Sequence, residues 1–147
     1  MKHKLKHAYS LSAREWVLLA EAWLTISWID FVISLLPYHW WKSWLFNQYE
    51  AETHQAANLE HLVWSVNAAA DHHLRKPTCL RRSLTLKQML QRRKIPAKLR
   101  IGINKDGADL KAHAWIEYTG IVLNDSPDIA TSYSQFPVFE EKLLRRL

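Results

Sequence analysis

Cys79 is the only thiol in this chain of 147 residues, and its neighbours could activate it as a nucleophile. A helix breaker, Pro77, and a capping residue, Thr78, precede it, so we expect Cys79 in the first turn of a helix. Unpaired N–H groups and the helix dipole stabilise a thiolate there, and the same N–H groups could hold an oxyanion. The alternative is a small buried side chain without chemistry.

Of the eight histidines that could serve as a general base, His113 has the most suitable surroundings. It lies in an apolar, alternating segment, 112–117, between two alanines that leave room for a second group to approach the ring. The adjacent His72 and His73 would point about 100° apart on a helix, which argues against a metal site there. We therefore predict a base at His113 and no metal.

Asp125 is the expected partner of His113. We read 118–120 as a three-residue hairpin loop because glycine stands at its third position, which would pair residue 117 with 121 and place Asp125 opposite His113. A two-residue loop at 119–120 would place Asp125 on the other face of the sheet. Asn124 is the second candidate for orienting the imidazole.

The combination of these residues resembles the transglutaminase-like cysteine peptidases of lasso peptide biosynthesis, in their stand-alone leader peptidase form. The resemblance is close from about Asn58 to Asp125 and looser from Leu11 to Phe46. It rests on the segments 79–84, 90–93, 95–97, 99–102 and 112–117, with Asp125 twelve residues after the histidine. Lys94 departs from the family pattern, which commonly has glycine before Ile95 and Pro96.

The resemblance implies a papain-like or transglutaminase-like core, in which the helix that carries the cysteine packs on an antiparallel sheet. It implies that Cys79 attacks the scissile carbonyl, that His113 acts as general base and then acid, and that Asp125 orients the imidazole. The backbone N–H of Cys79 would serve as an oxyanion donor. The implied reaction is removal of the leader from a ribosomally made precursor peptide, with no cofactor. The implied partners are that precursor, a small leader-binding protein with a recognition element, and an asparagine-synthetase-like cyclase that closes the macrolactam.

The elements that position these residues indicate an α+β chain forming one domain over residues 1–147. Seven of the eight tryptophans fall in the first 64 residues, and all three glycines lie in the last third. We therefore expect a helical, tryptophan-rich segment over residues 1–50 and the peptidase core over 51–147. Three glycines also exclude a glycine-rich phosphate loop.

The first helix is expected to begin at Ser12, with Glu15 completing a capping box. Between Trp16 and Leu36 the apolar residues keep to no single stripe. We expect either one helix whose buried face rotates, or two short helices that meet near 25–27. Beyond it we expect a short aromatic segment, helices over 51–74, 79–93 and about 139–147, strands over 99–105, 111–118 and 121–125, and a turn over 104–109.

A formal charge of +6 favours an anionic partner without choosing among them. Five residues of the helix at 79–93 are expected to face solvent: Arg81, Arg82, Lys87, Arg92 and Arg93. Of these, Arg81 and Arg82 could attract an acidic leader. Aromatic residues that could contact the peptide or a partner protein are Trp23, Trp28, Trp40, Trp41 and Trp115. A solvated helix face and ordinary core packing are the respective alternatives.

Two other functions stay open. One is a non-catalytic scaffold that delivers the precursor to the cyclase, and the other is a nucleic-acid-binding module, which charge alone favours and which we do not expect. The lone cysteine fits a reducing compartment. Acidic residues interrupt the apolar stretch over 16–36, so we expect a cytoplasmic protein with no stable membrane insertion.

Overall fold

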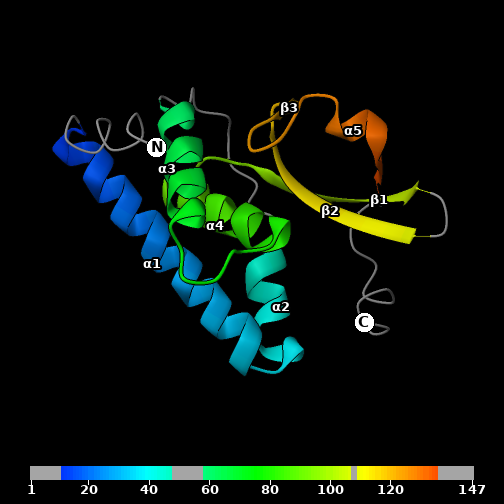
Figure 1. Ribbon diagram of the computed structural model, residues 1–147, viewed down its shortest axis with the longest axis horizontal. Helices are drawn as coiled ribbons and strands as arrows, with labels where there is room; N and C mark the ends of the chain where they lie inside the picture. Colours follow the sequence, from blue (N-terminus) through cyan, green and yellow to red (C-terminus); the bar gives the residue numbers. More distant parts are fainter. Residues whose placement is uncertain (1–10, 48–57, 107–108, 136–147) are drawn as a thin grey trace.

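The computed structural model describes residues 11–47, 58–106 and 109–135. In Figure 1 the helices α1 (Ala13–Leu35), α3 (Leu59–Asp71) and α4 (Cys79–Arg92) gather on one side of a sheet, with α2 (Tyr38–Phe46) beyond the end of α1. Helix α4 packs against α1, α3 and the sheet, so the helix that begins with the cysteine is the central element.

The sheet is antiparallel, with the strand order β3-β2-β1-β4. Its long strands are β1 (Lys98–Asp106) and β2 (Asp109–Tyr118), and its short edge strands are β3 (Ile121–Val122) and β4 (Ser134–Gln135). A short helix, α5 (Ile129–Ser132), connects the two edge strands. The expected α+β fold, with the cysteine-bearing helix on a small antiparallel sheet, is therefore confirmed.

One hydrophobic core joins the helices to the sheet. Its fully buried members include Ile26 from α1, Val66 from α3, Leu84 from α4 and Ile116 from β2. The first helix is thus built into the same core as the cysteine-bearing helix, rather than forming a separate layer.

Helix α1 is a single helix, and neither of the two expected arrangements occurs. It begins with the expected capping box between Ser12 and Glu15. Its buried residues all lie on one face of the helix: Ala22, Thr25, Ile26, Ile29 and Val32. The face does not rotate; the polar side chains instead border two apolar stripes, of which only one is buried.

Acidic residues at the borders of the buried stripe of α1 pair with arginines of α4 and of its C-cap, Arg93. A carboxylate oxygen of Glu21 lies 2.6 Å from a guanidinium nitrogen of Arg93, and one of Asp30 lies 3.1 Å from Arg81. Hydrogen bonding from Arg93 lowers the pKa of Glu21 below its ordinary value. These acids therefore fasten α1 to α4, which explains why polar residues occur on two sides of an otherwise apolar helix.

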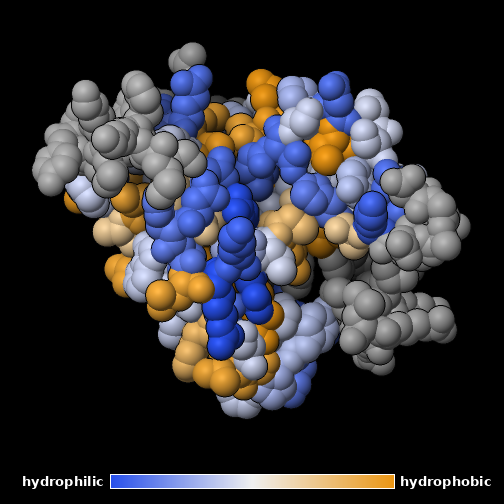
Figure 2. Space-filling view, in the orientation of Figure 1, coloured by the Kyte–Doolittle hydropathy of each residue, from blue (hydrophilic) through white to orange (hydrophobic). Residues whose placement is uncertain are grey.

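The second apolar stripe of α1 is exposed. This outer stripe consists of Val17, Leu24, Trp28, Phe31 and Leu35, each at least 50% exposed. Figure 2 shows apolar surface gathering along α1 and α2. By length and composition alone α1 could also cross a membrane. In this fold its inner side packs on α3 and α4 instead.

Several expected boundaries differ from the observed ones. The described part of the helix expected over 51–74 is α3, which ends at Asp71, and Leu74 beyond it is 92% exposed. Strand β1 continues through 104–106, where a turn was expected. The third strand stops at Val122 instead of Asp125. Residues 51–57 and the helix expected near 139–147 lie outside the described residues.

Lys94 stands where the family pattern commonly has glycine, and its backbone is in the left-handed conformation. Its φ is 57°, and its N–H donates to the carbonyl of Gln91 (2.9 Å) just after the end of α4. The left-handed conformation is costly for a residue with a Cβ.

We expect Lys94→Gly to raise the free energy of unfolding by about 0.5–1 kcal/mol in urea titrations. The matched change Lys98→Gly, in regular β1, should lower it, and a loss of stability in Lys94→Gly would contradict this explanation.

Candidate active site

Cys79 is the first residue of α4, as expected. Thr78 has extended backbone geometry, and its hydroxyl accepts a hydrogen bond from the N–H of Arg81 (3.4 Å). The N–H groups of the first helical turn have no acceptor within the helix, so they and the dipole favour negative charge at this end. The Cys79 side chain is half-buried and free of any disulfide.

His113 and Asp125 are in direct contact. Nε2 of His113 hydrogen-bonds to Oδ2 of Asp125, and both side chains are about one quarter exposed. The other carboxylate oxygen, Oδ1, accepts the backbone N–H of Ser126 at 2.8 Å. Because the carboxylate holds Nε2, a neutral imidazole has its proton on that nitrogen and its lone pair on Nδ1.

The expected hairpin register is nevertheless wrong. Glu117 pairs with Val122 and Tyr118 with Ile121, so the loop has two residues, Thr119 and Gly120. Both have positive φ, 48° and 82°, which is the combination that a tight two-residue hairpin needs. We expected Gly120 to be the third residue of a three-residue loop. It is instead the second residue of a two-residue turn.

Asp125 reaches His113 because the third strand ends early. A regular strand in the observed register would turn Asp125 to the opposite face. Instead the chain leaves the strand after Val122 and bends over 123–125. The bend carries Asp125 back to His113, so the contact was predicted correctly from the wrong register.

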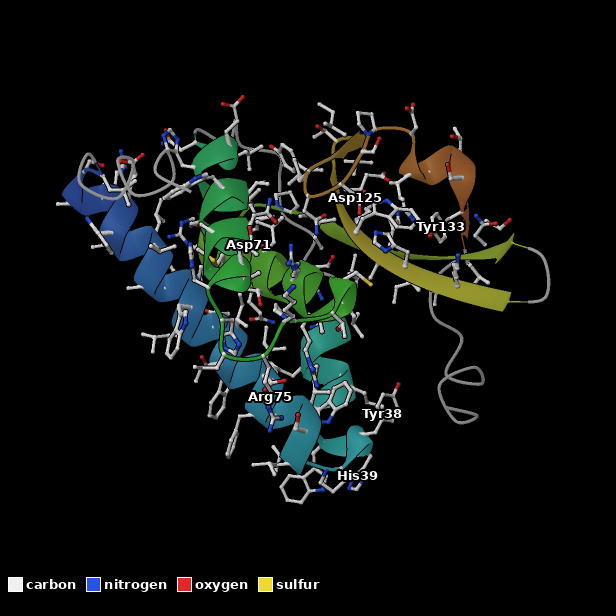
Figure 3. All side chains as sticks on the ribbon, in the orientation of Figure 1. Tyr38, His39, Asp71, Arg75, Asp125 and Tyr133 are labelled. Carbon is white, nitrogen blue, oxygen red and sulfur yellow. The ribbon has the colours of Figure 1, made fainter. Side chains whose placement is uncertain are left out.

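Two aromatic rings lie beside the imidazole of His113. The ring of Trp115 is stacked at 6.4 Å between centroids, and that of Tyr133 is tilted at 5.4 Å. Gly102 makes this packing possible, because a Cβ there would lie 2.7 Å from the Cβ of Tyr133 and 2.9 Å from the Trp115 ring. Figure 3 shows Asp125 and Tyr133 at the sheet end of the molecule, away from Tyr38 and His39 of α2.

The structure corrects the role expected of Trp115. Its side chain is fully buried, so it cannot serve as a contact surface for a peptide or a partner. It supports the imidazole from within. The tryptophans expected at a surface lie on α1 and α2: Trp23, Trp28 and Trp40 are exposed, and Trp41 is half-buried with its indole N–H donating to the carbonyl of Leu36.

The basic side chains of α4 are largely used inside the fold. Arg81 is held by Asp30 and by the hydroxyl of Ser34, while Arg82 lies 3.3 Å from Asp71 at the surface. Lys87 was expected to face solvent but is 2% exposed, and burial lowers its pKa to about 8. Packing of α4 on several sides leaves too little open surface for a continuous basic face.

Two residues of the site were missed in the sequence. Tyr133 follows α5, a helix too short for any periodic pattern. The one available signal was Gly102 within a strand, since such glycines often mark a close approach by another segment. Ser83, one turn after Cys79, donates to the backbone carbonyl of Ala114 (2.9 Å), next to His113. Nothing in the sequence distinguishes that serine from one facing solvent.

The arrangement combines parts that acyl transfer requires. A thiol stands at a helix amino terminus, and a histidine oriented by a carboxylate stands on the strand to which that helix is bonded. Among the described residues, no group of three or more His, Cys, Asp or Glu side chains could hold a metal ion.

This combination of a cysteine-bearing helix and a strand-borne histidine defines a class of protein. The chain belongs to the transglutaminase-like superfamily, whose family model matches residues 31–138 and so covers all three residues. A curated relative is the microcin J25-processing protein McjB of Escherichia coli. It is 33% identical over 97 residues, which are 63% of this chain and 46% of the relative, so the chain spans less than half of that protein. The two matches confirm the resemblance inferred from the motifs. No solved structure is significantly similar to the chain.

Proposed function

We propose that this protein is a cysteine peptidase that removes the leader from the precursor of a lasso peptide. The observation that carries the proposal is the bond between Nε2 of His113 and Asp125, which leaves Nδ1 to act as the base. Membership of the superfamily and the name of the microcin J25-processing relative support the reaction class. Cytoplasmic location without a cofactor is part of the same proposal.

In the proposed mechanism, Nδ1 of His113 takes the thiol proton of Cys79, and the thiolate attacks the scissile carbonyl carbon. The oxyanion that forms is held by the backbone N–H of Cys79. The peptide C–N bond then breaks, and His113 returns its proton to the leaving amine, which is the new N-terminus of the core peptide. Water, deprotonated by His113, then attacks the thioester carbonyl. The C–S bond breaks, the leader leaves as a carboxylic acid that ionises, and His113 returns its proton to the Cys79 sulfur. Asp125 keeps the proton on Nε2 and stabilises the imidazolium.

The scaffold and nucleic-acid alternatives lack comparable support. A scaffold gives no reason for a carboxylate to orient an imidazole beside the helix that starts with the only cysteine. A nucleic-acid-binding helix needs free cations, yet Arg81, Arg92 and Arg93 pair with acidic residues of α1. Surface charge alone does not make up for that loss.

For the partners, we propose that the outer stripe of α1, flanked by Trp23 and together with Trp40 of α2, docks the leader-binding protein. These side chains form an apolar helix face that the described residues leave uncovered.

The double change Leu24→Ser with Phe31→Ser should weaken binding of the leader-binding protein at least about 10-fold in calorimetry. The control Ile121→Ser, equally exposed on β3, should not, and unchanged binding in the double variant would contradict this role. The cyclase then acts on the released core peptide.

The catalytic role of Cys79 can be separated from the scaffold alternative by alkylation. At pH 7 we expect iodoacetamide to modify Cys79 of the folded protein at least about 10-fold faster than the same residue in the urea-unfolded chain. In His113→Ala the rate should fall to that of the unfolded chain. Mass spectrometry of tryptic peptides gives both rates. Alkylation of the folded protein no faster than that of the unfolded chain would identify a structural thiol and overturn the proposal.

A further inference from the structure

A chain of hydrogen bonds connects the three segments that carry the proposed catalytic residues. The side-chain hydroxyl of Ser83 donates to the carbonyl of Ala114, and the side-chain amide of Asn124 donates to the oxygen of Ser83, each at 2.9 Å. The amide oxygen of Asn124 accepts the backbone N–H of Ile116 at 2.8 Å. Because Ile116 supplies an N–H, the amide orientation of Asn124 is determined: its oxygen faces β2 and its nitrogen faces Ser83.

This network lies where the sheet leaves β2 without a partner strand. Strand β3 covers only Glu117 and Tyr118. Backbone groups alternate along a strand, so those of Ala114 and Ile116 point to the same uncovered edge. The carbonyl of Ile116 accepts the N–H of Leu123 at 2.9 Å, and the Asn124 and Ser83 side chains take the next two positions. Two side chains thus replace the missing part of the third strand.

Each proposed catalytic residue is adjacent to a member of this network. Ser83 lies one helical turn beyond Cys79, on the same side of α4. Ala114 directly follows His113 in β2, and Asn124 directly precedes Asp125 in the bend. Ser83 is fully buried and Ala114 nearly so, which means that water does not readily replace a lost bond.

From this arrangement we propose that Ser83 and Asn124 are positioning residues that set the placement of Cys79 relative to the His113–Asp125 pair. The inference rests on the proposed peptidase function. Ser83 bonds the cysteine helix to the histidine strand, and Asn124 holds the bend that delivers the aspartate. In this role neither residue takes part in bond breaking or proton transfer. Their loss changes the geometry of the reacting groups while the fold remains, because the hydrophobic core of α4 is untouched.

The test compares Ser83→Ala with Ser65→Ala. Ser65 is an equally buried serine whose hydroxyl donates to a backbone carbonyl, that of Leu62 at 2.8 Å, but within α3 and outside the network. Both variants lose one buried hydroxyl that donates to a backbone carbonyl, but only Ser83→Ala also leaves the side-chain amide of Asn124 without its acceptor. We expect Ser83→Ala to lower kcat for precursor cleavage about 10- to 100-fold with little change in KM. Ser65→Ala should keep the wild-type kcat.

A second readout separates positioning from simple destabilisation. The rate of Cys79 alkylation at pH 7 should fall toward that of the urea-unfolded chain in Ser83→Ala, and should stay at the wild-type value in Ser65→Ala. Ser83→Thr, which keeps the hydroxyl, should restore both kcat and the alkylation rate. Equal behaviour of the two alanine variants, in kcat and in the alkylation rate, would overturn the positioning role. If wild-type Cys79 itself is alkylated no faster than the unfolded chain, the peptidase proposal fails instead, so the two failures are distinguishable.

Discussion

Replacing Cys79 by alanine is expected to lower the rate of leader cleavage by about 10³-fold or more, because Cys79 is the only thiol in the sequence. The side chain is small and only half-buried, so the fold should survive the change. Cleavage is followed by chromatography and mass spectrometry of the precursor. Thermal unfolding of the same sample shows whether the variant is folded.

Two controls sharpen this prediction. Cys79→Ser keeps the shape of the side chain but offers a much weaker nucleophile, so it should be nearly as inactive as alanine. Binding of the precursor should persist in both variants, because each change removes only the thiol. A folded alanine variant that cleaves at a rate within about 10-fold of wild type would show that Cys79 is not the nucleophile.

Replacing Asp125 by asparagine should lower kcat by about 10²- to 10⁴-fold, and the structure gives the reason. Oδ1 of Asp125 already accepts the N–H of Ser126, so an asparagine oxygen is expected to stay there. The new NH₂ group then faces Nε2 of His113 and donates to it. This forces the imidazole proton onto Nδ1, where it blocks transfer from the Cys79 thiol.

The measurement is the rate of a single turnover with enzyme in excess, which isolates the chemical step. The control is Asp128→Asn, the same change on a nearby exposed aspartate at the start of α5, which should leave the rate unchanged. A rate in Asp125→Asn close to that of wild type would contradict the tautomer argument. It would also remove Asp125 from the proposed mechanism.

The start of α4 could be predicted from the sequence because its signals are local. Pro77 followed by Thr78 marks the amino terminus of the helix that begins at Cys79, and Thr78 caps that helix as expected. The pairing of His113 with Asp125 was also predicted, although from an incorrect register. Turn type depends on backbone angles at Thr119 and Gly120, and either loop length is compatible with those two residue types.

Features that depend on distant segments could not be predicted. The sequence shows that the apolar residues of α1 keep to no single stripe, but only the positions of Arg81 in α4 and of Arg93 at its C-cap show why polar residues interrupt them. Lys87 has the sequence context of a surface lysine and becomes buried because α4 is packed on several sides. Tyr133 reaches His113 through two very short elements whose local preferences carry almost no information.

The most direct test of the proposed mechanism is to look for its covalent intermediate. A reaction of the protein with its precursor, quenched in acid within one turnover, should contain protein whose intact mass is increased by the leader minus one water. Digestion should place that thioester on Cys79, and hydroxylamine should release it. The Cys79→Ala variant should show neither the adduct nor free leader. Leader released at the wild-type rate by Cys79→Ala, or an adduct on another residue, would contradict the account.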